Sequence, residues 1–255
     1  MLQEERFEYI LSRVSENGAV KVTSVAEELG ISQSTIRRDI KELAETGRLH
    51  KVFGGAVANE NVITTSDSAI SVRENEHTQA KDDIGRFAAE QINRDDFVFI
   101  DAGTTTRRII PYIDESLKGT VTFVTNGVVH ARELAARGFL VYLPGGLLKG
   151  TTEAIVGTSA VDYVEDCNFT KSFMGTNGVD LNKGYTIPEM DESRMKASII
   201  KNSHTVYVLA DSSKFDKVSS VSFGKLQDAC IITDAIPDNG YSDATVILEA
   251  VCQDR

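Results

Sequence analysis

Residues 20–57 read VKVTSVAEELGISQSTIRRDIKELAETGRLHKVFGGAV. This stretch decides the fold of the N-terminal part, because helical spacing occurs in it twice in succession. The first helix has apolar residues at i, i+3, i+4 and i+7, the pattern of one buried face. These are Val22, Val25, Ala26 and Leu29. Either Thr23 or Ser24 is its expected N-cap, and Gly30 its expected left-handed end.

A second helix follows, with Ser32 as the expected N-cap and Thr46-Gly47 as the expected end. Its apolar positions Ile36, Ile40 and Leu43 run along one side. Polar and basic residues occupy the other side, the composition that the DNA major groove requires of a recognition helix. Asp39 follows two arginines and is expected to orient one of them.

Beyond the second helix, residues 48–53 followed by Gly54-Gly55 are typical of a β-hairpin wing. The pattern as a whole is that of a winged helix-turn-helix. A further helix is predicted over 3–16, ended by Asn17-Gly18. The predicted DNA contacts are Ser32, Gln33, Ser34, Thr35, Arg37, Arg38, Lys41, Arg48 and Lys51.

The net charge of −11 is unlike that of a nonspecific nucleic-acid binder, but the acidity is unevenly distributed. Residues 1–56 hold eight Lys/Arg and nine Asp/Glu, so the remainder holds 19 against 29. Residues 30–51 hold five Lys/Arg and three Asp/Glu. The predicted contact face is therefore locally basic, and the acidic excess belongs to the rest of the chain.

At 255 residues and 41% hydrophobic content, the chain is expected to form two domains. We predict a DNA-binding domain over 1–57, a polar linker over 58–78 without helical periodicity, and a larger domain over 79–255. No run of about 18 apolar residues exists and the start is charged, so no membrane association and a cytoplasmic location are expected.

The cysteine and histidine residues lack metal-ligand spacing. Cys167, Cys230 and Cys252 are scattered and are expected to be reduced. His50, His77, His130 and His204 form no paired motif. The sequence therefore predicts no metal site and no cofactor.

From residue 79 onward, helical and strand-like segments alternate, which predicts an α/β domain with a mostly parallel sheet. Predicted helices cover 79–92, 105–113, 127–137, 158–166 and 189–202. Predicted strands cover 97–101, 120–125, 139–143, 171–175, 204–210, 229–233 and 245–250. Ligands of such sheets bind beyond the carboxyl ends of the strands.

The loops at these strand ends are small and polar. Residues 101–106, DAGTTT, join a strand to a helix, and such a turn either caps the helix or holds a phosphate with hydroxyls and backbone N–H groups. Residues 125–127, 144–146, 175–178 and 211–214 lie at further strand ends. Several converging polar loops favour a phosphorylated polyhydroxy ligand.

Seven motifs together resemble the DeoR family of bacterial sugar-metabolism regulators, nearly over the full length. They are SQSTIRRD at 32–39, GGA at 54–56, DAGTTT at 101–106, VTNG at 124–127, PGG at 144–146, GTNGV at 175–179 and ADSSKF at 210–215. Residues 174–196 and 109–113 further resemble the Gram-positive fructose-operon repressors of that family.

The resemblance implies a winged helix joined to a domain similar to ribose-5-phosphate isomerase, which binds a sugar phosphate. It implies that Lys81 and the 103–106 loop hold the phosphate. The effector-binding residues then expected are Lys81, Asp101, Gly103, Thr104, Thr105, Thr106, Asn126, Gly145, Gly146, Asn177, Gly178, Lys196 and Lys214.

Several residues depart from the family pattern. Phe53 stands where a histidine is common, and Ile187 and Glu189 replace a threonine and an aspartate. Arg107 and Arg108 follow the hydroxyl loop, where they either grip phosphate or face solvent.

Two functions remain to be compared. The first is a repressor of a sugar operon, bound as a dimer or tetramer to double-stranded operator DNA and released by a sugar phosphate. Fructose 1-phosphate is the first expectation, before fructose 1,6-bisphosphate and fructose 6-phosphate. The second is a sugar-phosphate isomerase with an appended DNA-binding module, disfavoured because neutral Asn177 stands where an acidic residue is expected.

Overall fold

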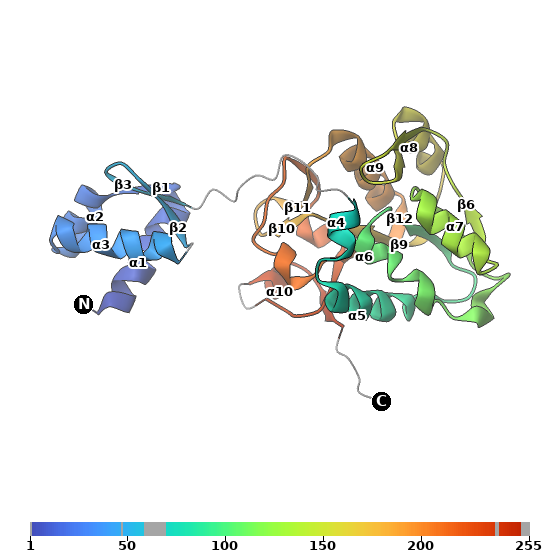
Figure 1. Ribbon diagram of the computed structural model, residues 1–255, viewed down its shortest axis with the longest axis horizontal. Helices are drawn as coiled ribbons and strands as arrows, with labels where there is room; N and C mark the ends of the chain where they lie inside the picture. Colours follow the sequence, from blue (N-terminus) through green and yellow to red (C-terminus); the bar gives the residue numbers. More distant parts are fainter. Residues whose placement is uncertain (1, 47, 59–69, 238–239, 251–255) are drawn as a thin grey trace. The chain divides into compact units, whose positions relative to one another are not determined.

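The computed structural model describes residues 2–46, 48–58, 70–237 and 240–250. The chain divides into two compact units, Met1–Ile63 and Thr64–Arg255. Each unit is described by itself (Figure 1). Gly47, Cys252 and most of the predicted linker lie outside the described residues.

The N-terminal unit contains three helices and a three-stranded antiparallel sheet of order β1-β3-β2. The elements are α1 (Gln3–Asn17), β1 (Ala19–Lys21), α2 (Val22–Leu29), α3 (Gln33–Glu45), β2 (Leu49–Val52) and β3 (Gly55–Ala58). The predicted winged helix-turn-helix is confirmed. The third strand, β1, was not predicted.

In this unit, α1 and α2 end at the expected glycines, and α3 begins at its expected N-cap. Gly18 and Gly30 adopt left-handed conformations after α1 and α2, with φ of 72° and 65°. The Ser32 hydroxyl accepts a hydrogen bond from the backbone N–H of Thr35, which makes it the N-cap of α3. The predicted cap of α2 was wrong, because that helix begins at Val22 and its N-cap is Lys21.

The core of the N-terminal unit is built from the predicted apolar faces. Ile36, Ile40 and Leu43 of α3 are buried against Ile10 of α1 and Leu49 of β2. The wing packs closely on this core, since a Cβ atom at Gly55 would lie 2.0 Å from the carbonyl oxygen of Val20. Gly55 is therefore required by the approach of β1 to β3.

A short helix, α4 (Ile70–Glu74), lies within the segment predicted to lack helices, so that expectation was wrong for these residues. It belongs to the C-terminal unit. Its last residue, Glu74, forms an ion pair with Arg107. Five residues are too few to produce a readable helical periodicity, which explains why the sequence did not reveal it.

The centre of the C-terminal unit is a seven-stranded parallel sheet of order β15-β14-β12-β9-β4-β5-β6. Its strands are β4 (Phe97–Ile100), β5 (Thr122–Thr125), β6 (Leu140–Tyr142), β9 (Phe169–Gly175), β12 (Ser203–Leu209), β14 (Cys230–Thr233) and β15 (Ile247–Glu249). The predicted parallel α/β domain is confirmed, and each predicted strand overlaps one of these seven.

Helices cover both faces of this sheet (Figure 1). They are α5 (Thr78–Ala89), α6 (Thr104–Arg107), α7 (Val128–Ala136), α8 (Thr158–Glu165), α9 (Met190–Lys201) and α10 (Tyr241–Ala244). The predicted helix over 105–113 is shorter than expected, since α6 ends at Arg107 and a 3₁₀ turn, η1 (Ile110–Tyr112), follows. Further 3₁₀ turns are η2 (Glu115–Leu117), η3 (Ser212–Lys214) and η4 (Leu226–Asp228).

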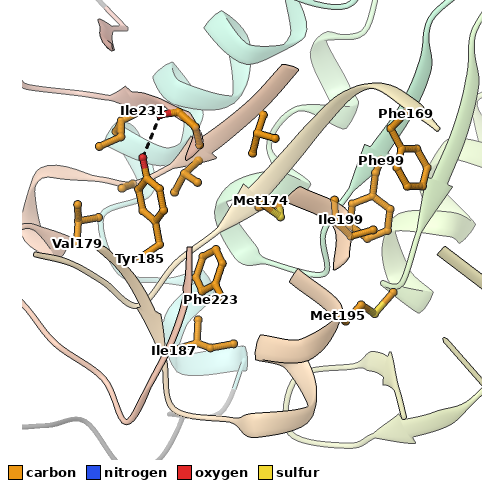
Figure 2. Packing of buried hydrophobic residues seen from close by; sticks show 14 of the residues in the cluster. Phe99, Phe169, Met174, Val179, Tyr185, Ile187, Met195, Ile199, Phe223 and Ile231 are labelled. Atoms are coloured by element: carbon orange, nitrogen blue, oxygen red, sulfur yellow. Dashed lines mark hydrogen bonds between the residues drawn. The ribbon is translucent and has the colours of Figure 1, made fainter. Parts of the chain in front are cut away.

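Successive residues of the central strands point into different cores. Phe99 and Met174 pack with α8, α9 and the aromatic pair Tyr185 and Phe223, which stack with ring centroids 5.9 Å apart (Figure 2). Ile100 and the neighbouring Phe173 pack on the opposite side, where the buried residues of α5 lie. This alternation is the period-two pattern of a sheet buried on both faces.

In the C-terminal unit, five short strands among the described residues were not predicted. The hairpin of β7 (Leu147–Lys149) and β8 (Ala154–Val156) follows β6. A second antiparallel sheet has the order β10-β11-β13, from Gly178–Asp180, Gly184–Ile187 and Val221–Gly224. Strands of three or four residues carry too little pattern to be separated from loops.

Among the described residues, no helix is long and apolar enough to span a bilayer. Cys167 and Cys230 are free thiols, and burial raises the pKa of both. No group of three His, Cys, Asp or Glu side chains in the described part of the chain is arranged to hold a metal ion.

Candidate nucleic-acid interface and ligand pocket

The outer face of α3 carries the predicted DNA contacts. Gln33, Ser34, Arg37, Arg38 and Lys41 are exposed, whereas the apolar side of the helix is buried. Ser32 is exposed as well, and its hydroxyl lies 2.8 Å from that of Ser34. Thr35 is half-buried at the first turn. The helix therefore presents one continuous polar and cationic face.

The cations of this face have few internal partners. Among the described residues, the Arg37 guanidinium donates only to Gln33, at 3.3 Å. Lys41 and Glu45 form an i,i+4 pair at 3.5 Å in which both side chains are 64% exposed, and such pairs contribute little stability. The Arg38 side chain has no hydrogen bond or ion pair within the described residues. These charges are therefore available to an external anion.

The predicted role of Asp39 was wrong. Asp39 is 1% exposed and accepts two hydrogen bonds from the guanidinium of Arg6 on α1, at 2.7 and 2.9 Å. It therefore ties α3 to α1 and does not orient Arg37 or Arg38. The sequence could not show this, because the partners are 33 residues apart.

The wing adds a second exposed element. Arg48, just before β2, and Lys51 on β2 are exposed, and both are among the residues predicted to contact DNA. Between β2 and β3, Phe53 exposes its whole side chain and Gly54 has a φ of 83°. From the sequence, Phe53 stood out only as a departure from the family pattern. A fully exposed phenylalanine at a hairpin tip is itself a candidate contact.

In the C-terminal unit, the chain reverses its direction of strand addition at β4. It proceeds from β4 to β5 and β6 on one side, and later to β9, β12, β14 and β15 on the other. The carboxyl ends of β4 and β9 therefore form a topological switch point, where open α/β sheets bind ligands. Asp101 follows β4 there, and Gly175 ends β9.

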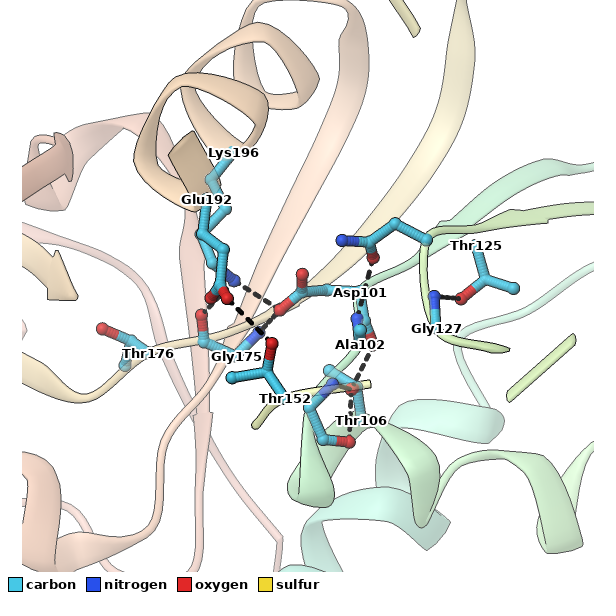
Figure 3. Close-up of polar contacts among 12 residues, drawn as sticks. Asp101, Ala102, Thr106, Thr125, Gly127, Thr152, Gly175, Thr176, Glu192 and Lys196 are labelled. Carbon is cyan, nitrogen blue, oxygen red and sulfur yellow. Dashed lines mark hydrogen bonds and ion pairs between the residues drawn. The ribbon is translucent and has the colours of Figure 1, made fainter. Parts of the chain in front are cut away.

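Asp101 and Lys196 form the centre of this site (Figure 3). The Lys196 ammonium forms an ion pair with the Asp101 carboxylate and donates to the carbonyl of Gly175 at 2.9 Å. Asp101 also accepts from the backbone N–H of Gly175 at 3.1 Å. Both charged side chains are less than a tenth exposed. Helix α9 thus supplies a lysine to a carboxylate 95 residues away in the sequence.

The loop after Asp101 is held by its own polar groups. The Thr106 hydroxyl donates to the carbonyl of Asp101 at 2.6 Å and accepts from the N–H of Gly103 at 3.0 Å. The Asn126 side chain accepts from the N–H of Ala102 at 2.9 Å. Thr104 and Thr105 line a pocket at these strand ends, and their hydroxyls have no hydrogen bond among the described residues.

His130 of α7 lies behind this loop. Its Nε2 is 3.1 Å from the carbonyl oxygen of Gly103 and 3.4 Å from the hydroxyl of Thr106. The contact with a carbonyl requires the tautomer protonated at Nε2. Burial lowers the pKa of His130 to about 4, so the ring is neutral at physiological pH. It supports the loop as a neutral donor.

A cationic wall lies on another side of the pocket. Lys81 of α5 is 3% exposed, and its ammonium donates to the carbonyl of Arg73 in α4. Burial lowers the pKa of Lys81, and the nearby charge of Asp211 partly offsets this effect. Lys214 and Arg73 line the same pocket. The Lys214 side chain has no hydrogen bond or ion pair in the described part of the chain.

The third wall of the pocket was not predicted from the sequence. The tip between β7 and β8 supplies Thr152, which is 2% exposed and donates to Glu192 of α9 at 3.0 Å. Lys149 donates to the same carboxylate at 3.2 Å. Burial opposes the charge of Lys149, but Glu192 outweighs it and the pKa of Lys149 is raised. Glu192 lies one helical turn before Lys196, and that spacing was the available signal.

These walls enclose one polar pocket, which we call the switch-point pocket. It brings together the predicted residues Lys81, Asp101, Gly103, Thr104, Thr105, Asn177, Lys196 and Lys214. Its other lining residues are Arg73, Ala102, Thr152, Gly175, Thr176 and Glu192. The structure does not place Thr106, Asn126, Gly145, Gly146 or Gly178 in its lining.

The predicted residues outside the lining have other contacts. Thr106 and Asn126 stabilise the 101–106 loop from within, so their polar atoms are occupied. A Cβ atom at Gly178 would lie 2.2 Å from the carbonyl oxygen of Lys217, so that glycine is required by packing. Gly145 and Gly146 are exposed between β6 and β7.

A larger cavity of about 630 Å³ lies beside the switch-point pocket, and Thr104 lines both. Arg107 and Arg108 line this larger cavity. Arg107 pairs with Glu133 at 2.6 Å and with Glu74. Arg107 therefore fits neither of the two roles weighed from the sequence, because carboxylates already occupy its guanidinium. Arg108 is half-buried.

Both units match established family models. Residues 6–62 match the DeoR-like helix-turn-helix domain, and residues 76–235 match the DeoR C terminal sensor domain. The chain belongs to the DeoR family. The resemblance stated from the sequence is thereby confirmed, and the chain is a DNA-binding transcriptional regulator by family.

Two DeoR-family relatives cover almost the whole chain. FruR of Bacillus subtilis (strain 168), named an uncharacterized HTH-type transcriptional regulator, is 36% identical over 97% of this chain and 98% of its own length. The lactose phosphotransferase system repressor of Streptococcus mutans is 30% identical over 94% of this chain and 95% of its own. Among solved structures, ribose 5 phosphate isomerase A from Neisseria gonorrhoeae gives a TM-score of 0.38 at 15% identity, covering 54% of this chain and 53% of the isomerase.

Proposed function

We propose that this DeoR-family regulator represses a sugar-utilisation operon and that a sugar phosphate bound in the switch-point pocket releases it from DNA. The observation that carries the proposal is the presence, in one chain, of an exposed cationic helix face and a buried polar pocket with cations on one wall. The relative named a lactose phosphotransferase system repressor supports the assignment as a repressor.

The DNA-binding half rests on α3 and the wing. We assign base reading to the exposed Gln33, Arg37 and Arg38, and contacts with the phosphate backbone to the exposed Lys41, Arg48 and Lys51. One module of this size presents few cations, so two or more copies per operator are expected, as a dimer or a tetramer on repeated half-sites.

The ligand-binding half places the phosphate against Lys81, Lys214 and the hydroxyls of Thr104 and Thr105. These groups line the pocket, and the Lys214 ammonium and both hydroxyls lack hydrogen-bond partners among the described residues. Asp101, Asn177 and Lys196 then face the sugar hydroxyls. A carboxylate, an amide and an ammonium together supply both donors and acceptors for them.

The pocket must open to admit such a ligand. Its volume is about 40 Å³, which suits water molecules, whereas ligand pockets usually measure about 300–1,000 Å³. We expect two hydrogen bonds to break when the pocket opens, since each one holds a short element against it. They are the bond from Lys81 to the Arg73 carbonyl in α4 and the bond from Thr152 to Glu192 at the β7–β8 tip.

Movement of α4 would connect the ligand to the DNA-binding unit. This helix is the first described element after β3, and Lys81 holds its Arg73 carbonyl. A phosphate that engages the Lys81 ammonium competes with that carbonyl and loosens α4. A ligand shifts a conformational equilibrium only by its difference in affinity for the two states. Exchange of the Lys81 partner provides such a difference.

Fructose 1-phosphate is the proposed ligand, ahead of other fructose phosphates. The fructose-repressor resemblance of residues 174–196 supports fructose. The residue chemistry supports a phosphorylated polyol in general. The choice among sugars is therefore tested with a panel of sugar phosphates.

An isomerase activity is the second candidate function, because the pocket contains two carboxylates, Asp101 and Glu192. An enediol mechanism requires a carboxylate placed to remove a proton from the substrate. Asp101 is held by Lys196 and the Gly175 N–H, and Glu192 by Thr152 and Lys149. We therefore propose binding without turnover. Conversion of ribose 5-phosphate or a fructose phosphate by the purified chain would contradict this.

A thermal-shift screen tests the ligand-binding half directly. A ligand at 100 times its dissociation constant adds about 2.7 kcal/mol to the state that it binds. We expect fructose 1-phosphate to raise the melting temperature of the wild type and not that of Thr105→Ala. Ser116→Ala, which is exposed and lines neither cavity, is the matched control and should respond like the wild type. No shift with any sugar phosphate would overturn the proposed ligand class.

A further inference from the structure

The charged residues of the switch-point pocket are separated by sign. The cationic wall consists of Arg73, Lys81 and Lys214, which come from α4, α5 and η3. The other charged lining residues are Asp101, Glu192 and Lys196. The hydrogen bonds keep these groups apart, because Lys81 contacts α4 whereas Lys196 pairs with Asp101.

The two walls differ in their net charge. The cationic wall has three positive side chains, and the carboxylates that act on Lys81, Asp211 and Glu76, do not line the pocket. On the opposite wall, Lys196 neutralises Asp101. Glu192 then leaves that wall with a negative charge, since its cationic partner Lys149 is shared with a second carboxylate, Glu189, and does not line the pocket.

The Glu192 carboxylate is fixed in position. Its Oε1 accepts from the Thr152 hydroxyl at 3.0 Å and from the Lys149 ammonium at 3.2 Å. Its side chain is 13% exposed. Figure 3 shows Glu192 and Lys196 extending from α9 toward Gly175 and Asp101. Such a carboxylate accepts hydrogen bonds from sugar hydroxyls but has no donor for a phosphate oxygen.

We propose that Glu192 makes the pocket selective for sugars with one phosphate and excludes sugars with a phosphate at each end. The phosphate of a monophosphate lies at the cationic wall, and its far hydroxyls donate to Glu192. A second phosphate would be placed against the fixed carboxylate, and like charges brought together in a buried site are strongly unfavourable. This inference rests on the proposed function, because it assumes that the sugar phosphate binds in this pocket.

Titration calorimetry of the full-length chain with fructose 1-phosphate, fructose 6-phosphate and fructose 1,6-bisphosphate tests the inference. The wild type should bind a monophosphate at least about tenfold more tightly than the bisphosphate. Glu192→Gln keeps an acceptor for Thr152 but removes the charge, so it should reduce that preference by about tenfold or more.

Glu189→Gln is the matched control. Glu189 pairs with the same lysine, Lys149, at 3.3 Å, but it is 44% exposed and does not line the pocket. This variant should keep the wild-type preference. If Glu192→Gln does not fold, the comparison of monophosphate with bisphosphate on the wild type still tests the inference, because equal binding contradicts it.

The outcomes separate the two claims. Equal binding of monophosphate and bisphosphate by the wild type would overturn the role of Glu192 and leave the proposed ligand class intact. A preference unchanged in Glu192→Gln would do the same. Absence of binding by every sugar phosphate would overturn the proposed ligand class and this inference together.

Discussion

The two units use cations in opposite ways. On α3, Arg37, Arg38 and Lys41 stand on an exposed face with weak internal partners or none among the described residues. In the C-terminal unit, Lys81 and Lys196 are buried and already bonded to a carbonyl or a carboxylate. The first arrangement is ready for phosphate, whereas the second requires an exchange of partners.

This difference shows what controls each kind of binding. Exposed cations on DNA-binding proteins gain affinity from released counterions, so salt concentration controls them. Buried cations cost free energy unless they are paired, so a ligand must replace a partner of comparable strength. A closed pocket of this kind couples binding to structural change, and an exposed face does not.

The largest effect is expected from breaking the buried pair. Lys196→Ala leaves Asp101 without its cation, and removal of one partner of a buried ion pair costs about 3–5 kcal/mol of unfolding free energy. Urea unfolding followed by circular dichroism measures it. Lys201→Ala, at an exposed position of the same helix, is the control and should cost well under 1 kcal/mol. Equal losses in both variants would remove the contrast between buried and exposed cations.

The pH dependence of stability should reveal the neutral histidine behind the loop. The pKa of His130 is about 4 in the folded chain, below its ordinary value of 6.5. As pH falls from 6.5 to 4, the unfolded chain binds a proton at this residue that the folded chain does not. The unfolding free energy should therefore fall by up to about 1.4 kcal/mol per pH unit from this group.

His130→Gln should remove that contribution and flatten the stability profile between pH 6.5 and 4. His204→Gln, at an exposed position, should keep the wild-type slope. The measurement is urea unfolding at a series of pH values. Parallel profiles for wild type and His130→Gln would show that the ring is not held neutral by burial.

On the DNA-binding side, Arg38→Ala should reduce affinity for a duplex selected from a random pool. Loss of a base-reading arginine usually costs about 1–3 kcal/mol, or about 5–150-fold. Binding of fructose 1-phosphate should not change, because Arg38 lies in the other unit. Fluorescence anisotropy and calorimetry measure the two affinities. Arg94→Ala removes an exposed arginine of the C-terminal unit and should leave both unchanged.

The smallest effects are expected at the wing, where a cation and an aromatic side chain can be separated. Lys51→Ala should lower the slope of log affinity against log salt by about 1, because one phosphate contact is lost. Phe53→Ala should weaken binding without changing that slope, since an apolar contact releases no counterion. Identical salt slopes for Lys51→Ala and the wild type would place the wing away from the DNA backbone.

The sequence predicted local features well and long-range pairings poorly. The α2–α3 pattern and the cap at Ser32 were readable because helical spacing and capping involve residues within a few positions. The partner of Asp39 was not readable, because Arg6 belongs to another helix. The pairing of Lys196 with Asp101 required the order of β4 and β9 in the sheet.

The same limit applies to the pocket. The loop 101–106 was identified, but the inward role of Thr106 depends on hydrogen bonds that spacing does not reveal. Thr152 comes from a short hairpin that carries too little pattern to predict. Residues that line a pocket from several elements become visible only when the topology is known.

The central claim is that a sugar phosphate in the switch-point pocket weakens DNA binding by α3 and the wing. The most direct test is fluorescence anisotropy of the full-length chain on its selected duplex, with and without saturating fructose 1-phosphate. We predict a loss of DNA affinity of about 5–150-fold, the usual range of allosteric coupling. Thr105→Ala should bind the same DNA as tightly as the wild type and lose this response. Unchanged DNA affinity with every sugar phosphate of the panel, or an unchanged response in Thr105→Ala, would contradict the claim.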